Sequence, residues 1–165
     1  MDINSTRAFT TKYSGLSRRL RNKIKINNEG AISRELEALW DTGATKTCIS
    51  KEVAAEIGLV KIGEAEMSSA SETVITSVYC ADVILPNSVV VPDVEIFEAN
   101  LSPQGIDALI GMDIITLGDF SISNYDGVTI FTFRTPSQKP TDYVQQINAQ
   151  KVIGKTHGQG KRKRK

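Results

Sequence analysis

Short extended segments separated by turn signals are the feature that most limits how this chain can fold. Several segments are rich in β-branched residues or alternate apolar and polar positions, as half-buried strands do. Turn-forming residues separate them, and Asn124–Gly127 is a strong hairpin signal. The expected strands cover Lys23–Asn27, Arg34–Trp40, segments between Met67 and Phe97, Ile106–Ile110, Phe120–Ser123 and Val128–Phe133. Such a series predicts a mostly-β barrel or sandwich.

Only short helices are expected between these strands. Ser50 can cap a helix over Lys51–Ile57. A second helix is expected over Met112–Leu117, ending at Gly118. A third is expected over Thr141–Ala149. The strands do not alternate with long helices, so a parallel α/β fold is not predicted.

Length and composition describe a single globular domain. The chain has 165 residues, of which 40% are hydrophobic and 24% charged. These values exclude collagen-like, wholly disordered and disulfide-scaffold classes. Cys48 and Cys80 are too few for a disulfide framework and are expected to be free thiols in a reducing compartment. No signal peptide or membrane-spanning run is recognised, so a cytoplasmic location is predicted.

Charge is distributed unevenly along the chain. Residues 1–34 carry eight basic and two acidic side chains, residues 35–150 carry five basic and 17 acidic, and residues 151–165 carry seven basic and none acidic. We expect a basic, irregular arm over 1–20, a folded domain over 21–136, a helical extension over 137–153 and a disordered basic tail over 154–165. Contact of the tail with nucleic acid is an alternative that the sequence does not favour over simple solubility. His157 has no Cys or carboxylate neighbours, so no metal site and no cofactor are predicted.

The residues that point to chemistry are Asp41-Thr42-Gly43-Ala44. A carboxylate that directly follows an apolar strand end costs free energy unless it is hydrogen-bonded or used. Gly43 lets the backbone approach closely, and the N–H groups of Gly43 and Ala44 could point at the Asp41 carboxylate. Taken alone, Asp41 could simply stabilise a turn with its own side chain.

A second motif, Ala108-Leu109-Ile110-Gly111, lies about seventy residues further along and precedes a predicted helix. An Asp-Thr-Gly-Ala loop paired with a distant apolar-apolar-Gly strand resembles the retropepsin-like aspartic proteases, and the bacterial and eukaryotic members more than the viral ones. The resemblance covers roughly residues 24–133. It implies a closed or partly open acid-protease barrel with short helices, one lobe per chain, so that 21–136 would be the protease domain.

The resemblance also implies a mechanism. Peptide hydrolysis in this family needs two aspartates across a shared water, and this chain supplies one. A two-fold homodimer acting on a peptide or protein substrate is therefore expected, with Asp41 facing its own copy. Thr45 and Met112 stand where viral relatives often carry an acid and an arginine, so the dimer must be held in another way.

Other roles are carried over by position. Thr42 and Gly43 join Asp41 as catalytic-loop residues, with the Thr42 hydroxyl bonding across the dimer axis. Ala44, Thr45 and Ile110 fall among the substrate-binding residues. Met67–Thr76 matches the flap that closes over the peptide, with its tip at Ser69, Ala70 and Ser71, all substrate-binding by resemblance.

Other functions remain as alternatives. A non-catalytic dimer of the same fold could bind peptides or act as a scaffold, although the intact Asp41 favours an active endopeptidase. A phosphate site or a phosphoaspartyl nucleophile could also use a strand-Asp-x-Gly loop. Those sites need a Gly-rich or βαβ context that this chain lacks.

Overall fold

The computed structural model describes residues 6–68 and 73–159. Strands dominate the secondary structure in this part of the chain. In chain order the elements are β1 (Arg7–Lys12), β2 (Arg21–Asn28), β3 (Ala31–Ile32), β4 (Leu36–Trp40), β5 (Cys48–Ser50), α1 (Lys51–Glu56), β6 (Lys61–Ser68), β7 (Thr73–Leu85), η1 (Pro86–Ser88), β8 (Val89–Ala99), η2 (Ser102–Gln104), β9 (Ala108–Ile110), α2 (Met112–Ile115), β10 (Asp119–Ser123), η3 (Tyr125–Gly127), β11 (Ile130–Thr135) and α3 (Tyr143–Gln159).

The larger sheet closes on itself. Its strands follow the order β3-β2-β4-β9-β5-β8-β7-β6, and β2 also pairs with β7 from Lys25↔Ile84 to Asn27↔Asp82. This extra pairing joins β2, β4, β9, β5, β8 and β7 into a ring. The predicted mostly-β barrel with short helices is therefore confirmed.

A second, three-stranded sheet has the order β1-β11-β10. The irregular conformation predicted for residues 1–20 is wrong for Arg7–Lys12, which pair with Thr135–Ile130 along the whole of β1. The local sequence hides this strand because Phe9 and Ala8 are its only apolar residues. Its pairing partner lies more than a hundred residues away, and that partner decides its conformation.

Aromatic side chains join the small sheet to the barrel. The Trp40 ring, at the end of β4, lies 5.1 Å from the Phe131 ring and 5.2 Å from the Phe133 ring, measured between centroids. Phe9 and Phe120 complete the cluster, with Phe120 5.0 Å from Phe131. The end of β4, directly before Asp41, is thus held by its pairing in the barrel and by packing on the small sheet.

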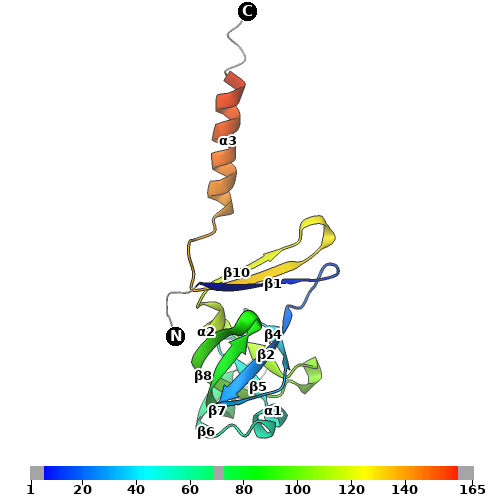
Figure 1. Cartoon of the computed structure of the whole chain (residues 1–165), viewed down its shortest axis with the longest axis vertical. Helices are drawn as coiled ribbons and strands as arrows, with labels where there is room; N and C mark the ends of the chain where they lie inside the picture. Colours follow the sequence, from blue (N-terminus) through cyan, green and yellow to red (C-terminus); the bar gives the residue numbers. More distant parts are fainter. Residues whose placement is uncertain (1–5, 69–72, 160–165) are drawn as a thin grey trace, which may run out of the picture.

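Helix α3 stands apart from the rest of the molecule. Figure 1 shows β1 and β10 across one end of the barrel and α3 projecting beyond them. Side chains 143–151 are all exposed, and Asp142 caps the helix by accepting from the Val144 and Gln145 N–H groups. The helix continues to Gln159, through the point at which the sequence predicts a disordered tail. Among the described residues, no helix has both the length and the apolar character needed to cross a bilayer.

Candidate active site

Asp41 lies where β4 ends beside β9. These two strands run parallel, with Trp40 opposite Ile110. The Asp41 N–H donates to the Ile110 carbonyl at 2.9 Å, which extends the pairing by one residue. The two sequence motifs, seventy residues apart, therefore meet at one point of the barrel.

The Asp41 carboxylate is held by its own loop. Its Oδ1 accepts a hydrogen bond from the Gly43 N–H at 2.8 Å, as predicted. The Ala44 N–H donates to the Asp41 carbonyl oxygen instead, at 3.3 Å, so the prediction that it points at the carboxylate is wrong. Asp41 is half-buried, whereas Thr42, Gly43 and Thr45 are exposed. A reacting group can therefore reach the carboxylate from solvent.

Gly111 lets the loop over residues 41–47 lie directly on α2. A Cβ atom built on Gly111 would meet the Lys46 carbonyl carbon at 2.5 Å and its oxygen at 2.6 Å. Across this contact the Met112 N–H donates to the Ala44 carbonyl at 2.8 Å. Only a residue without a side chain permits so close a backbone approach.

Hydrogen bonds between Thr47 and Asp113 hold the same loop. Asp113 Oδ2 accepts from the Thr47 N–H and Asp113 Oδ1 from the Thr47 hydroxyl, both at 2.8 Å. The hydroxyl in turn accepts from the Gly111 N–H at 3.2 Å. Thr47 is only 1% exposed. Asp113 Oδ1 also accepts from the Ile114 N–H at 2.9 Å, at the start of α2. Sequence reasoning missed the pairing of Thr47 with Asp113, because the two residues lie 66 positions apart.

Ile110, assigned by resemblance to substrate binding, is 0% exposed. Its side chain packs in the core of this chain, and its carbonyl supports Asp41. Ala44 remains half-buried against a separate apolar cluster, together with Leu39 and Met67. The core of that cluster is Cys48, Val78, Phe97, Leu101, Ile106 and Leu109.

Strands β6 and β7 form the hairpin expected for the flap. They pair antiparallel from Lys61↔Tyr79 to Ser68↔Thr73. Ser69, Ala70 and Ser71 lie outside the described residues. Several apolar side chains on this hairpin are exposed, including Ile62, Val74 and Ile75. Met67 instead packs on the apolar cluster beside Ala44.

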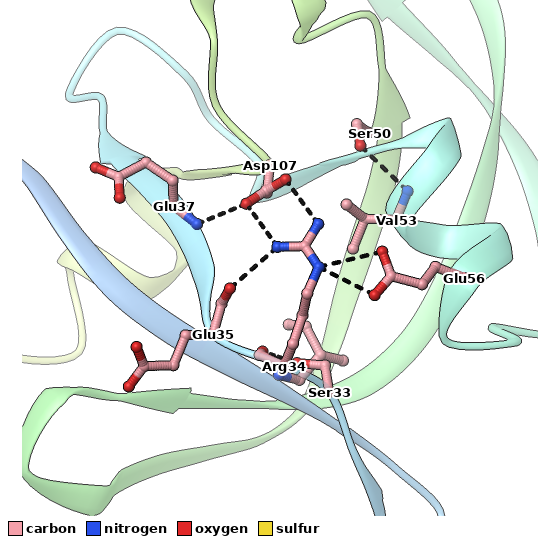
Figure 2. A network of polar contacts seen from close by, with 9 residues as sticks. Ser33, Arg34, Glu35, Glu37, Ser50, Val53, Glu56 and Asp107 are labelled. Atoms are coloured by element: carbon pink, nitrogen blue, oxygen red, sulfur yellow. Dashed lines mark hydrogen bonds and ion pairs between the residues drawn. The ribbon is translucent and has the colours of Figure 1, made fainter.

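An ion-pair network centred on Asp107 lies at the start of β9 (Figure 2). The Arg34 guanidinium donates to both Asp107 oxygens at 3.2 Å and to Glu56 on α1 at 3.0 Å. Asp107 also accepts from the Glu37 N–H on β4 at 2.7 Å. Burial raises the pKa of Asp107, but the hydrogen bonds from Arg34 and Glu37 outweigh this and hold it below its ordinary value. The network thus aligns β4 and β9, whose ends present Asp41.

Cys48 and the other possible ligand side chains complete the description of the Asp41 surroundings. Burial, with smaller contributions from Asp113 and Asp41, raises the pKa of the Cys48 thiol to about 11, so it is no thiolate nucleophile. The described residues bring together no group of three or more His, Cys, Asp or Glu side chains that could hold a metal ion.

An open depression of about 460 Å³ lies beside Asp41 and Thr42. Its walls are contributed by three parts of the chain that are distant in sequence. They are the segment Ser17–Leu20, the end of β4, and the β10 region with Phe120, Ile122 and Asn124.

Comparisons with known proteins agree with this geometry. A sequence profile described as aspartyl protease matches residues 23–114. A comparison with curated proteins finds no match.

Among solved structures, a retropepsin-like aspartic protease from Rickettsia conorii matches 79% of this chain and 96% of its own, with 15% identity and a TM-score of 0.53. The retroviral protease-like domain of Ddi1 from Leishmania major matches 70% of this chain and 95% of its own, with 14% identity and a TM-score of 0.44. The profile covers the Asp41 loop and the Gly111 motif together, and the chain belongs to the aspartyl protease family with a retropepsin-like fold.

Proposed function

We propose that this chain is one half of a homodimeric aspartic endopeptidase. Two copies would place their Asp41 carboxyls on either side of one water molecule. The observation that carries the proposal is the Asp41 carboxylate itself, oriented by the Gly43 N–H at the edge of an open depression. The 165 residues contain this Asp-Thr-Gly loop once, and in the proposal the second carboxylate is supplied by a second copy.

The proposed chemistry follows from bringing two carboxyls together. Two carboxyl groups at hydrogen-bond distance do not both ionise, because their negative charges would repel each other. One carboxyl therefore keeps its proton. The ionised carboxylate accepts a proton from the water, whose oxygen attacks the scissile carbonyl carbon. The protonated carboxyl donates its proton to the carbonyl oxygen, which gives a tetrahedral gem-diol. As this intermediate collapses, the C–N bond breaks, the carboxyl that took the water's proton gives it to the departing amine nitrogen, and the other carboxyl takes back a hydroxyl proton as the new carboxyl group forms. These steps belong to the pair, and neither copy holds a fixed role.

The substrate would bind as an added strand. The β6–β7 hairpin contributes Ala65, Met67 and Val78 to the apolar cluster on which Ala44 packs. A peptide lying along the hairpin beside that cluster would pair through its backbone, while its side chains meet Ala44 and the exposed Thr45. Thr42, exposed at the edge of the depression, is proposed to bond across the dimer axis.

We also place this activity in the cytoplasm. Cys48 and Cys80 both carry free thiols, and Cys80 is exposed. An exposed free thiol persists most readily in a reducing compartment.

The direct test is Asp41→Asn. We expect peptide cleavage to fall by at least about a hundredfold, because proton transfer by a positioned acid or base contributes that much or more. The dimer should persist. Asp126→Asn, in an exposed turn, is the matched control and should retain full activity. Undiminished turnover by Asp41→Asn would refute the assignment.

Mixing the two proteins tests the shared site. Excess Asp41→Asn added to the wild type should form mixed dimers that hold one carboxylate, and should suppress activity beyond simple dilution. Independent active monomers would show no such suppression. A wild type that dimerises but cleaves no member of a diverse peptide library would instead be a peptide-binding or scaffolding dimer.

A further inference from the structure

The basic segment over residues 151–165 is a feature that the proposed function leaves unexplained. It carries seven basic and no acidic side chains, and five of the seven stand together in Lys161–Lys165. Asp142 is the last acidic residue of the sequence. Residues 35–150, in contrast, carry five basic and 17 acidic side chains. A strongly basic segment therefore follows a strongly acidic part of the chain.

Helix α3 leads this segment away from the barrel (Figure 1). Side chains 143–151 are exposed, and within residues 6–68 and 73–159 no ion pair involves Lys151. The helix has 17 residues, which at 1.5 Å per residue is a length of about 25 Å. Lys161–Lys165 come after its last residue, Gln159, and lie outside the described residues. The basic segment thus begins on a solvent-exposed helix, without an ion pair to the acidic barrel.

The length of α3 decides how strongly the acidic barrel acts on charges at the far end of the helix. Salt screens interactions between exposed charges over about 8 Å at physiological ionic strength. The far end of α3 lies about 25 Å along the helix from Tyr143, roughly three times that distance. The barrel therefore does little to neutralise cations at the far end of α3, and it does little to repel a polyanion bound there.

We propose that residues 151–165 bind the phosphate backbone of nucleic acid without reading its base sequence. A DNA duplex carries about one negative charge per 1.7 Å of its axis, and lysine and arginine side chains bind it by neutralising phosphates. Lys161–Lys165 contains only cations, with no aromatic side chain to stack on a base and no apolar one to fill a pocket of a folded partner. Charge alone is the sequence-independent part of nucleic-acid binding. This binding does not depend on the proposed peptide cleavage.

An anionic membrane is the competing partner, and the chain favours it less. Helices that lie on a membrane combine an apolar face with a polar face rich in lysine and arginine. Helix α3 has only two such residues, Lys151 and Lys155, in its 17 positions. The run Lys161–Lys165 has no apolar side chain that could enter a bilayer. Nucleic acid requires neither feature, because phosphate contacts need charge alone.

The test is binding to a fluorescent DNA duplex of about 20 base pairs, followed by anisotropy at about 50 mM salt. The tail variant combines Lys161→Gln, Arg162→Gln, Lys163→Gln, Arg164→Gln and Lys165→Gln. It should bind at least about a hundredfold more weakly than the wild type, because it lacks five phosphate contacts. The matched control changes five exposed basic residues before α3 to glutamine, so its net charge equals that of the tail variant. These residues are Arg7, Lys12, Lys25, Lys51 and Lys139. The control should bind as tightly as the wild type.

The salt dependence of binding gives a second readout on the unaltered protein. Each phosphate contact adds about −0.9 to the slope of log K against log salt concentration, so five contacts give about −4.5. The affinity should therefore fall by about two to three orders of magnitude between 50 and 200 mM salt. A duplex of scrambled sequence should bind equally well, because the backbone carries the contacts.

Three results would overturn the inference. The first is a tail variant that binds the duplex as tightly as the wild type does. The second is a salt slope shallower than about −2, which leaves too few phosphate contacts for the basic run. The third is tighter binding to vesicles containing phosphatidylserine, or to polyglutamate, than to the duplex at the same salt concentration.

This proposal and the catalytic one fail separately. Asp41→Asn should bind the duplex as the wild type does, and the tail variant should cleave a short uncharged peptide at the wild-type rate. A wild type that binds the duplex but cleaves no peptide disproves only the catalytic proposal. A wild type that cleaves peptides but does not bind the duplex disproves only the nucleic-acid proposal.

Discussion

The Asp41 loop (residues 41–47) and the β6–β7 hairpin flank the same site but are held in opposite ways. Backbone contacts at Gly111 and the buried Thr47–Asp113 bonds fix the loop against α2. The hairpin carries exposed apolar side chains, and the Ser68 and Thr73 hydroxyls near its end bond to each other at the surface. The contrast is between a loop held by backbone contacts and buried hydrogen bonds and a hairpin end held by contacts at the surface. Paired substitutions, one in each region, test whether the loop and the hairpin differ in this way.

The largest difference is expected for glycine to alanine. Gly111→Ala forces a Cβ to within 2.5 Å of the Lys46 backbone, where no flexible side chain can give way. We expect it to cost about 3 kcal/mol or more of unfolding free energy and to abolish cleavage. Gly63→Ala on β6 meets nothing within 4 Å and should leave stability close to wild type. Denaturant unfolding of both variants measures this. Equal losses of unfolding free energy would contradict the difference in support between the loop and the hairpin.

A smaller difference is expected for threonine to valine. Thr47→Val removes a buried hydroxyl and leaves the Asp113 carboxylate and the Gly111 N–H each short of a partner. The expected loss is about 1–3 kcal/mol of unfolding free energy, with a fall in kcat as Asp41 loses its support. Thr73→Val, exposed on the hairpin, should stay within about 0.5 kcal/mol of the wild type. Similar losses of unfolding free energy at both positions would show that the buried Thr47 hydrogen bonds stabilise the loop no more than an exposed hydroxyl pair does.

The smallest difference concerns ion pairs. Arg34→Gln removes the partner of Asp107 and should cost about 1 kcal/mol or less near neutral pH, because Arg34 is half exposed. Lys61→Gln breaks the exposed pair with Glu64 and should change stability by no measurable amount.

The pH dependence of the Arg34→Gln effect gives a further check. The pKa of Asp107 is lowered in the folded chain, so its contribution is present above the unfolded value of 3.8 and is lost as pH falls through the folded value. The Arg34→Gln penalty should therefore shrink in acid. If the loss of unfolding free energy caused by Arg34→Gln stays constant from neutral pH into acid, the loss comes from packing of the Arg34 side chain and not from its charge.

Much of the fold was predictable because its signals are local. The alternation in Lys23–Asn27, the Asn124–Gly127 turn and the Ser50 cap each depend on a few neighbouring residues, and each matches an element of the structure. The Asp41 loop was predictable for the same reason.

What the sequence did not reveal depends on distant partners. Strand β1 forms by pairing with β11, Thr47 bonds to Asp113, and Arg34 pairs with Asp107, which lies 73 residues away in the sequence. No local pattern distinguishes these side chains from ordinary surface polar residues.

The pairing of β1 with β11 has a consequence for engineering. Arg7 stands opposite Thr135, so both ends of the folded body leave from one corner. A short linker from Thr135 to Arg7 has to span only the spacing between two paired strands, roughly 5 Å. A circular permutant that lacks α3 and opens in an exposed turn would therefore keep the pairing of β1 with β11.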